Sequence, residues 1–240
     1  MRGVLVKEWT EFENLTLEEC PAPELKSGEV RIRTQSAGVS FATSLVVSGK
    51  YQRKPPLPFV PGTEIAGIVT ERADGVVHVK EGDRVCAVLD WGGLAEEAVA
   101  HEVNVFPIPD SLEFNRAICL TNSYGTSYAA LCWPHLLRIR EGETLLVHGA
   151  AGGVGMAAIE IAKILGATVI ATAGSDEKLA VAKEHGADHR INYRKGEFRK
   201  KVLEITDGRG ADAIYDPVGG EVFAQSLRCI APEGRIMPVG

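Results

Sequence analysis

The pattern of apolar and polar positions changes near residue 110. Before it, short β-type runs such as Glu29–Gln35, Ile65–Glu71 and Arg84–Leu89 are separated by turn residues, and no helical period is sustained. After it, β-branched runs alternate with amphipathic stretches long enough for helices. The change predicts a mostly-β, barrel-like domain over residues 1–112 and an α/β domain over residues 113–240.

Strands and helices alternate regularly in the second domain. The predicted strands are Thr144–His148, Thr168–Thr172, His189–Asn192, Ala211–Tyr215 and Arg235–Val239. The predicted helices are Gly153–Leu165, Asp176–His185, Gly196–Thr206 and Glu221–Ile230, preceded by two more within Glu113–Leu137. Alternation at this spacing predicts a parallel, doubly wound sheet.

Composition narrows the class of protein. A chain of 240 residues that is 45% hydrophobic and 24% charged is typical of a globular protein. The net charge of -6 argues against nucleic-acid binding, which usually requires a basic surface. No apolar run approaches the ~20 residues that cross a bilayer, so no membrane association is expected. The 5 cysteines are scattered and form no Cys-x-x-Cys pair, which favours reduced thiols and a cytoplasmic location.

A glycine-rich segment supplies the strongest chemical signal. Gly149, Gly152, Gly153 and Gly155 follow an apolar strand and open an apolar helix. Glycines there allow a tight turn, a close approach of the backbone to a pyrophosphate, and close helix–strand packing. The helix N-terminus also presents free N–H groups to phosphates. The context of strand, turn and helix favours dinucleotide binding over a purely structural turn.

The end of the second strand favours NADPH over NADH. An NAD site places a carboxylate there for the ribose 2′-hydroxyl, whereas this chain has Gly174 followed by Ser175 and, further on, Lys178. A hydroxyl and a lysine suit a 2′-phosphate. Alternatively, Ser175 is a helix N-cap and Lys178 a solvated residue, and both interpretations can hold together. Asp176 leaves NAD open.

An ordered series of motifs resembles the quinone oxidoreductase, or zeta-crystallin-like, family of zinc-independent medium-chain dehydrogenases/reductases. These motifs are Gly28–Arg33, Ser36–Phe41, Leu57–Glu64, Gly82–Val85, Gly92–Glu96, Gly186–Asp188, Gly208–Asp212 and Asp216–Gly220. The resemblance implies a GroES-like catalytic domain followed by a Rossmann domain. It also implies that the chain is truncated at its C-terminus, without the sixth Rossmann strand and the return to the catalytic domain.

The resemblance implies a set of cofactor contacts. The backbone of Gly152, Gly153 and Val154 would contact the pyrophosphate of NADPH. The remaining contacts would be Ser175, Lys178 and Tyr193 around the 2′-phosphate, Thr126 near the nicotinamide, and Pro217 and Val218 over the ribose.

Catalytic residues follow from the same resemblance. Tyr51 matches a pocket tyrosine that would donate a hydrogen bond or a proton to substrate, although it could instead be a loop aromatic that packs on Pro55 or Pro56. Ser40 stands where the family usually has asparagine, and Thr43 where it has an acid, so the contact at Ser40 departs from the family pattern.

The resemblance also implies metal-free chemistry. Zinc-dependent relatives have cysteine and histidine where this chain has Ser40 and Thr63, and zinc prefers sulfur and imidazole ligands. Without a metal, the hydride acceptor would be a quinone or an α,β-unsaturated carbonyl. Two alternatives are a catalytically weak NADPH-binding protein with a regulatory role and an enoyl-thioester reductase. A homodimer is expected if the full-length form carries the missing edge strand.

Overall fold

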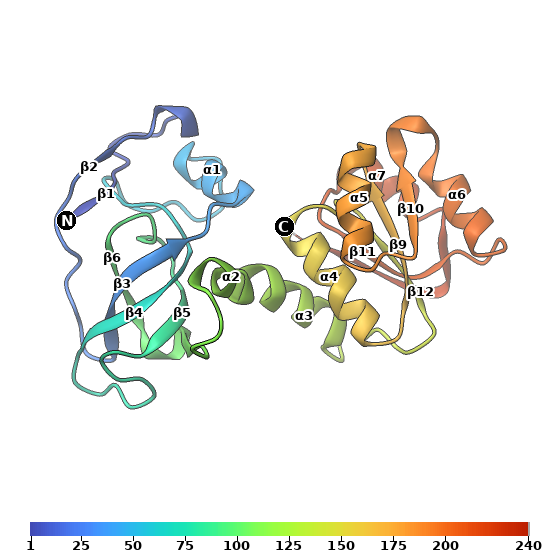
Figure 1. The fold of residues 1–240 in the computed structure, drawn as a ribbon. Coiled ribbons are helices and arrows are strands. Elements are labelled where there is room, and N and C mark those ends of the chain that lie inside the picture. The colour runs from blue at the N-terminus through green and yellow to red at the C-terminus, as the bar shows by residue number, and fades with distance from the viewer. Residues whose placement is uncertain (240) are drawn as a thin grey trace. The chain divides into compact units, whose positions relative to one another are not determined.

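The computed structural model describes residues 1–239 (Figure 1). Contacts divide the chain into two compact units, Met1–Asn122 and Ser123–Gly240. The sequence places the domain division after residue 112, and that division stays a prediction. The contacts place it later because helix α2 (Phe114–Cys119) packs on strands of the first unit.

The first unit is built on antiparallel strands, as the turn-rich sequence predicts. Its strands are β1 (Arg2–Val4), β2 (Leu17–Glu19), β3 (Glu29–Ala37), β4 (Glu64–Arg72), β5 (Arg84–Val88), β6 (Glu97–His101) and β7 (Val105–Pro107). Strands β1 and β2 pair with each other, and the main sheet has the order β6-β3-β4-β5-β7. Alternate residues of its strands, such as Val30 and Ile32, point into one buried cluster. The mostly-β prediction is therefore confirmed for this unit.

One short helix of the first unit escaped sequence analysis. Helix α1 (Phe41–Val47) has only 7 residues, too few to display a helical period. It begins with a capping box: the backbone N–H of Thr43 donates to the Ser40 hydroxyl, and the backbone N–H of Ser40 donates to the Thr43 hydroxyl. Short 3₁₀ turns occur at Phe12–Asn14 and Glu102–Asn104.

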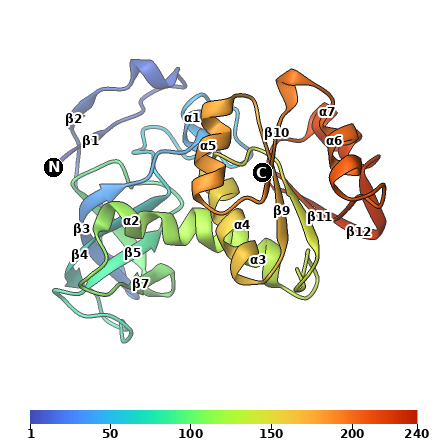
Figure 2. The same cartoon turned by 45° about the vertical axis from the view of Figure 1, so that its right-hand side comes forward.

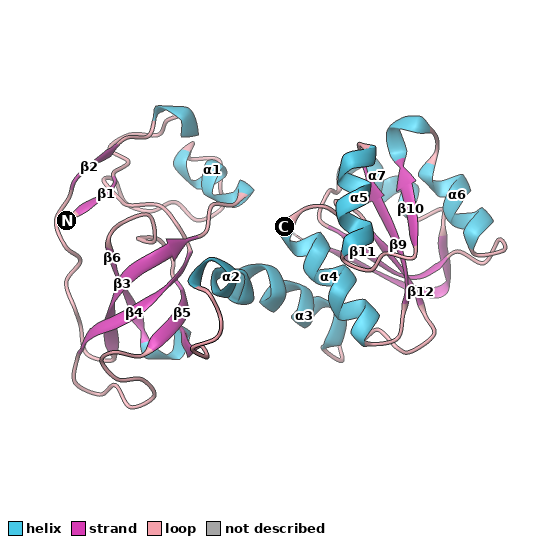
Figure 3. Ribbon diagram, in the orientation of Figure 1, coloured by secondary structure: helices cyan, strands magenta, loops and turns pink. Residues whose placement is uncertain are grey.

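The second unit contains the predicted parallel sheet, with the order β10-β9-β8-β11-β12. Its strands are β8 (Thr144–Val147), β9 (Thr168–Ala173), β10 (His189–Asn192), β11 (Ala211–Asp216) and β12 (Ile230–Pro238). Its helices are α3 (Gly125–Cys132), α4 (Gly153–Ile164), α5 (Asp176–Glu184), α6 (Phe198–Ile205) and α7 (Gly220–Ser226), with a 3₁₀ turn at Tyr193–Lys195. Figure 3 distinguishes these helices and strands by colour.

Two boundaries in this unit differ from the sequence expectation. The predicted helix Glu221–Ile230 ends at Ser226, and Ile230 already pairs with Ala211 of β11. Strand β12 therefore begins earlier than Arg235 and contains an irregularity around Glu233, whose φ of 61° lies in the left-handed region. The two helices expected within Glu113–Leu137 are α2 and α3, joined by a π-helical segment, Leu120–Tyr124.

Helices cover both faces of the parallel sheet (Figure 2). Alternating strand residues explain this arrangement: Leu145 and Val147 of β8 join a core with α3, α4 and α5, whereas Leu146 joins a core with α6. A strand buried on both faces must be apolar at every position, as β8 is after Thr144. No helix within residues 1–239 is both long enough and apolar enough to span a membrane.

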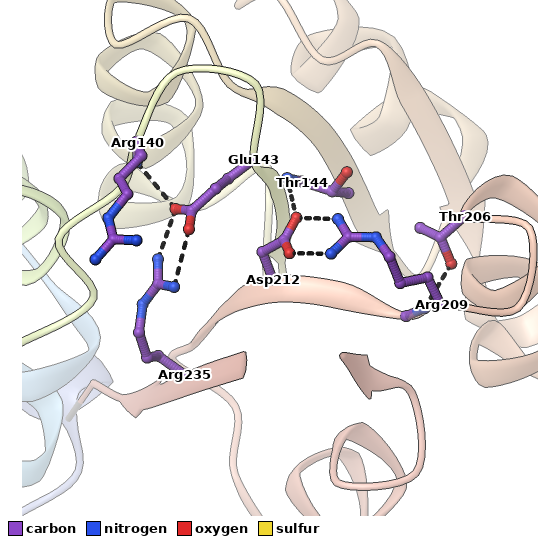
Figure 4. A network of polar contacts seen from close by, with 8 residues as sticks. Arg140, Glu143, Thr144, Thr206, Arg209, Asp212 and Arg235 are labelled. Carbon is purple, nitrogen blue, oxygen red and sulfur yellow. Dashed lines mark hydrogen bonds and ion pairs between the residues drawn. The ribbon is translucent and has the colours of Figure 1, made fainter. Parts of the chain in front are cut away.

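The amino ends of the strands are held by two carboxylate–arginine pairs (Figure 4). Glu143, directly before β8, accepts two hydrogen bonds from Arg235, at 2.9 and 2.6 Å, and one from the backbone N–H of Arg140. Asp212 of β11 accepts two hydrogen bonds from Arg209 at 2.5 Å and one from the Thr144 N–H. These bonds tie the segment before β8 to strands β11 and β12.

Candidate nucleotide-binding and catalytic residues

The glycine-rich loop leaves the carboxyl end of β8 and turns directly into α4. Gly149 has a φ of 56°, a left-handed conformation that favours glycine. A Cβ on Gly155 would lie 2.5 Å from the Gly149 carbonyl oxygen and 2.9 Å from the Ala150 Cα. Gly155 is therefore required for the close approach of helix α4 to the turn, as the sequence argument expects.

The first turn of α4 carries unpaired donors. Its N-cap residue, Gly152, makes no side-chain cap, and within residues 1–239 the backbone N–H groups of Gly153, Val154 and Gly155 have no acceptor. Gly152 and Gly153 are exposed. Free N–H groups at the positive end of a helix are suited to a phosphate.

Pro217 and Val218 lie beside this loop. A Cβ built on Gly149 would lie 3.3 Å from the Pro217 Cγ and 3.6 Å from a Val218 methyl carbon. The segment is held by Asp216, whose Oδ1 accepts the N–H groups of Val218 at 2.9 Å and Gly219 at 3.0 Å. The structure thus brings together the loop and the Pro-Val pair that the resemblance assigned to the ribose.

A serine next to Thr126 fixes the loop from the other side. Thr126 is half-buried on α3, and its neighbour Ser127 donates a 2.8 Å hydrogen bond to the Val154 carbonyl oxygen. The Ser127 hydroxyl also lies 3.0 Å from the buried Tyr215 hydroxyl. Ser127 and Tyr215 were not among the predicted site residues, because no local motif relates residues that are 88 positions apart.

A second set of polar side chains surrounds Gly174, at the carboxyl end of β9. A Cβ on Gly174 would lie 2.8 Å from the Tyr193 hydroxyl and 3.3 Å from the Arg194 Nε. The next residue, Ser175, caps α5 by accepting the Lys178 N–H at 3.3 Å. The structure therefore brings Tyr193 to Gly174 and confirms the cap that was one of the two interpretations of Ser175.

Arg194 is the cation that sequence analysis overlooked at this position. It directly follows Tyr193, so its place beside Gly174 depends on the pairing of β10 with β9. Its guanidinium and the Lys178 ammonium form no ion pair within residues 1–239, whereas Lys195 is paired with Asp176. Uncommitted cations at the end of the second strand favour an anionic ligand.

The predicted catalytic residues Ser40 and Tyr51 lie before and after α1 in the first unit. The Ser40 hydroxyl lies 3.3 Å from the Thr43 hydroxyl, so the two departures from the family pattern contact each other. Tyr51 is half-buried and packs against the cluster of Val6, Val46, Val47 and Phe59. Within residues 1–239 its hydroxyl makes no hydrogen bond, which leaves it able to serve a ligand.

Glu64, at the start of β4, is a buried carboxyl that sequence analysis missed. It is 8% exposed, and within residues 1–239 its Oε2 has no hydrogen-bond partner. Burial raises the pKa of Glu64, while hydrogen bonds from Asn122 oppose that shift. The neighbouring residue, Thr63, and Ser40 are the two positions where the family resemblance implies metal ligands in zinc-dependent relatives. Within residues 1–239, no three His, Cys, Asp or Glu side chains gather as a metal site would require.

His148 is a histidine of the second unit with structural partners. His148, which precedes Gly149, is 1% exposed. Its Nδ1 lies 2.8 Å from the Thr172 hydroxyl and its Nε2 lies 2.9 Å from the Ser226 hydroxyl. Burial lowers the pKa of His148 to about 4, although the charge of Asp216 opposes the shift. His148 is therefore a neutral packing residue at pH 7.

Comparison with known protein families assigns both halves of the chain. Residues 26–110 match the alcohol dehydrogenase GroES-like domain, and residues 153–240 match the family described as zinc-binding dehydrogenase. Together with the antiparallel sheet and the parallel Rossmann sheet, these matches define a member of the medium-chain dehydrogenase/reductase superfamily.

Curated relatives narrow the assignment from the superfamily to one family. The chain is 45% identical over 218 residues to quinone oxidoreductase-like protein 2 homolog of Nematostella vectensis, covering 90% of this chain and 59% of that protein. It is 36% identical to the quinone oxidoreductase of Rattus norvegicus, covering 100% of this chain and 73% of that one. The chain belongs to the quinone oxidoreductase family, and it spans about three fifths of the first of these relatives.

Solved structures of similar proteins agree with this family assignment. Escherichia coli quinone oxidoreductase complexed with NADPH superimposes with a TM-score of 0.89 at 29% identity, covering 100% of this chain and 76% of that one. The CurK enoyl reductase superimposes with a TM-score of 0.91 at 28% identity, covering 100% of this chain and 74% of that one.

Proposed function

We propose that this chain binds NADPH and belongs to a reductase that transfers hydride to a quinone or an α,β-unsaturated carbonyl. The observation that carries the proposal is a pair of anion-binding features at neighbouring strand ends. Unpaired N–H groups follow β8, and the uncommitted cations Lys178 and Arg194 accompany the end of β9. A dinucleotide with a pyrophosphate and a 2′-phosphate matches both.

The residues present fit this cofactor. Gly152 and Gly153 carry no Cβ and are exposed, so a pyrophosphate can approach their backbone. A Cβ on Gly153 would lie 2.7 Å from the Ser123 hydroxyl oxygen. Gly174 lacks the Cβ that would collide with the Tyr193 hydroxyl. In this proposal Ser175, Lys178 and Tyr193, together with Arg194, surround the 2′-phosphate.

NADPH supplies the hydride when bound. The chain contributes binding and orientation. The N–H groups of Gly153, Val154 and Gly155 are proposed to hold the pyrophosphate, whereas the Gly152 N–H, which the resemblance assigned to it, donates instead to the Gly149 carbonyl oxygen at 2.9 Å. Ser127 holds the start of α4 in place through the Val154 carbonyl. Thr126 is proposed to contact the nicotinamide, and Pro217 and Val218 to enclose the ribose.

Tyr51 is the proposed substrate-facing donor. Its hydroxyl would donate a hydrogen bond to the carbonyl oxygen of the acceptor and stabilise the negative charge that develops there. Ser40 is proposed to belong to the same catalytic site. A substrate would compete with Thr43 for the Ser40 hydroxyl, which takes part in the capping box of α1. We further propose that no metal takes part, because Ser40 and Thr63 offer oxygen where zinc would take sulfur and nitrogen.

The experiment combines nucleotide titration with a turnover assay. NADPH and NADH are titrated by fluorescence, and 1,2-naphthoquinone or an enone is then added to follow NADPH oxidation. Binding of NADPH with turnover, lost in Tyr51→Phe while NADPH affinity is unchanged, supports the proposal. Absence of binding by either nucleotide would overturn it, and stoichiometric zinc in the active protein would overturn its metal-free part.

Two alternatives remain testable in the same assay. Likeness to an enoyl reductase supports acyl-thioester substrates, which would then turn over while quinones would not. The commitment of the Ser40 hydroxyl to Thr43 supports a catalytically weak NADPH-binding protein with a regulatory role. That protein would bind NADPH without oxidising it with any of the three acceptors.

A further inference from the structure

The Asp176 carboxylate lies at a position where its negative charge would repel a 2′-phosphate. It follows Ser175, and it stands at the first position of α5, just beyond the end of β9. In sites for NADH a carboxylate near this point accepts hydrogen bonds from the ribose hydroxyls. The same carboxylate would repel the phosphate of NADPH, so its surroundings decide which nucleotide it favours.

Both oxygens of Asp176 are occupied by residues from the end of β10. The Asn192 side-chain amide donates to Oδ1 at 2.8 Å, and the Lys195 ammonium forms an ion pair with Oδ2. The hydrogen bond from Lys195, followed by that from Asn192, lowers the pKa of Asp176, so the carboxylate is ionised at neutral pH. Its charge is therefore matched by Lys195.

The turn that supplies Lys195 also positions Arg194. The side-chain oxygen of Asn192 accepts a hydrogen bond from the Arg194 backbone N–H at 3.1 Å. The side-chain nitrogen of Asn192 donates the hydrogen bond to Asp176. Lys195 and Arg194 thus have different tasks on one short 3₁₀ turn. Lys195 forms an ion pair with Asp176, whereas the Arg194 side chain lies beside Gly174 and forms no ion pair within residues 1–239.

Charge balance at this strand end depends on Lys195. The charged residues of the two segments that meet here, residues 175–178 and 192–195, are two acids, Asp176 and Glu177, and three bases, Lys178, Arg194 and Lys195, which leaves one positive charge in excess. Removal of Lys195 would bring the set to neutrality and free one oxygen of Asp176.

We infer that the Asp176–Lys195 ion pair sets the nucleotide preference of this site, because Lys195 cancels a carboxylate that would otherwise repel the 2′-phosphate of NADPH and accept from the 2′-hydroxyl of NADH. The inference rests on the proposed NADPH-binding function and names Lys195 as its specificity-determining residue. Lys195 acts through Asp176, so it is a positioning residue and not a direct ligand.

The test is a double-mutant cycle on nucleotide affinity. NADPH and NADH are titrated by fluorescence against the wild-type chain, Lys195→Gln, Asp176→Asn and the double variant. Lys195→Gln is expected to weaken NADPH about fivefold at low salt and to leave NADH unchanged or tighter. Asp176→Asn in the Lys195→Gln background should restore NADPH affinity to within about twofold, and 0.5 M salt should shrink the effect of Lys195→Gln. Lys201→Gln, an exposed lysine of α6, is the matched control.

The contrary results are distinct. If Lys195→Gln weakens both nucleotides equally, or if Asp176→Asn fails to restore NADPH binding, the inference is overturned while the proposed NADPH function stands. If the wild-type chain binds neither nucleotide, the proposed function fails, and the inference fails with it.

Discussion

The two edges of the parallel sheet in the second unit treat their polar groups in opposite ways. At the amino edge, the carboxylates of Glu143 and Asp212 are saturated by arginines and backbone N–H groups. At the carboxyl edge, the N–H groups of the α4 first turn and the cations Lys178 and Arg194 have no partner within residues 1–239. A ligand that binds at the carboxyl edge of such a sheet needs donors available there. The Asp176–Lys195 ion pair also lies at the carboxyl edge, but it leaves Lys178 and Arg194 without an ion pair within residues 1–239.

Both edges contain glycines, but they are held differently. Gly149, Gly152, Gly153, Gly155 and Gly174 accompany the free donors of the carboxyl edge, whereas turn glycines such as Gly142 and Gly166 precede strands at the amino edge. The amino edge is also held by the long side chain of Arg235, which contacts both Glu143 and the Leu137 carbonyl oxygen. Substitutions at the two edges should therefore separate stability from nucleotide binding.

The largest effect is expected for Gly155→Ala, which should damage both properties. The added Cβ would lie 2.5 Å from the Gly149 carbonyl oxygen, and only a backbone shift can relieve that contact. We expect a loss of about 1–3 kcal/mol in the free energy of unfolding and a loss of about 100-fold in NADPH affinity. Urea unfolding and fluorescence titration measure the two. Gly152→Ala, whose Cβ would have 3.3 Å to the same oxygen, should retain stability; equal destabilisation by both variants would contradict the packing argument.

The next largest effect concerns acid and His148, the fully paired residue behind the loop. Since its folded pKa is about 4 against 6.5 in the unfolded chain, the unfolded state takes up a proton first as pH falls. Stability contributed by neutral His148, about 3 kcal/mol, is complete above pH 6.5 and is lost progressively down to about pH 4. Urea unfolding at steps between pH 7.5 and 4 should show this slope in the wild type and not in His148→Gln.

Glu64 provides an internal contrast for that measurement. Because burial raises its folded pKa, its contribution has the opposite sign: it is present at low pH and lost as pH rises from the unfolded value of 4.5 through the folded pKa. Glu64→Gln should therefore remove a downward slope with rising pH, whereas His148→Gln removes an upward one. A His148→Gln profile parallel to wild type would show that another group governs the acid response.

A smaller effect is expected for Arg235→Ala at the amino edge, and it should be confined to stability. The substitution removes two hydrogen bonds to Glu143 and one to the Leu137 carbonyl oxygen, at a cost of about 2 kcal/mol in unfolding free energy. Arg209→Ala should cost less, because that side chain is 54% exposed. NADPH affinity should stay unchanged in both variants, and a marked loss of affinity would show that the amino edge also governs nucleotide binding.

The smallest effect, Arg194→Ala, should be confined to binding. Loss of an uncommitted cation beside Gly174 is expected to weaken NADPH about tenfold and to change NADH affinity by less than about twofold. The melting temperature should match wild type, because the guanidinium forms no ion pair within residues 1–239. Lys201→Ala serves as the control for a general charge effect, and an equal loss for NADH would show that Arg194 does not contact the 2′-phosphate.

Much of the secondary structure and the glycine-rich loop could be predicted, because both depend on residues that are close together in the chain. The strand His189–Asn192 and the start of α4 at Gly153 were predicted with their observed boundaries, since the alternation of strands with helices and a glycine turn are read from nearby residues. The Ser175 cap and the loop Gly149–Gly155 are likewise contained within a few consecutive residues. Helix α1 was not predicted, because its 7 residues are too few to display a helical period.

The alternation of elements, the glycine turn and the family motifs each depend on neighbours in the chain, so they follow from the amino-acid sequence. The groups that meet at the strand ends depend instead on the folded chain: Arg194 lies at Gly174, Lys195 pairs with Asp176, and Ser127 bonds the Val154 carbonyl oxygen. Those meetings depend on strand order, which places β10 beside β9, and on the packing of α3 against α4. Such contacts join residues distant in sequence, and no periodicity or motif encodes their distances.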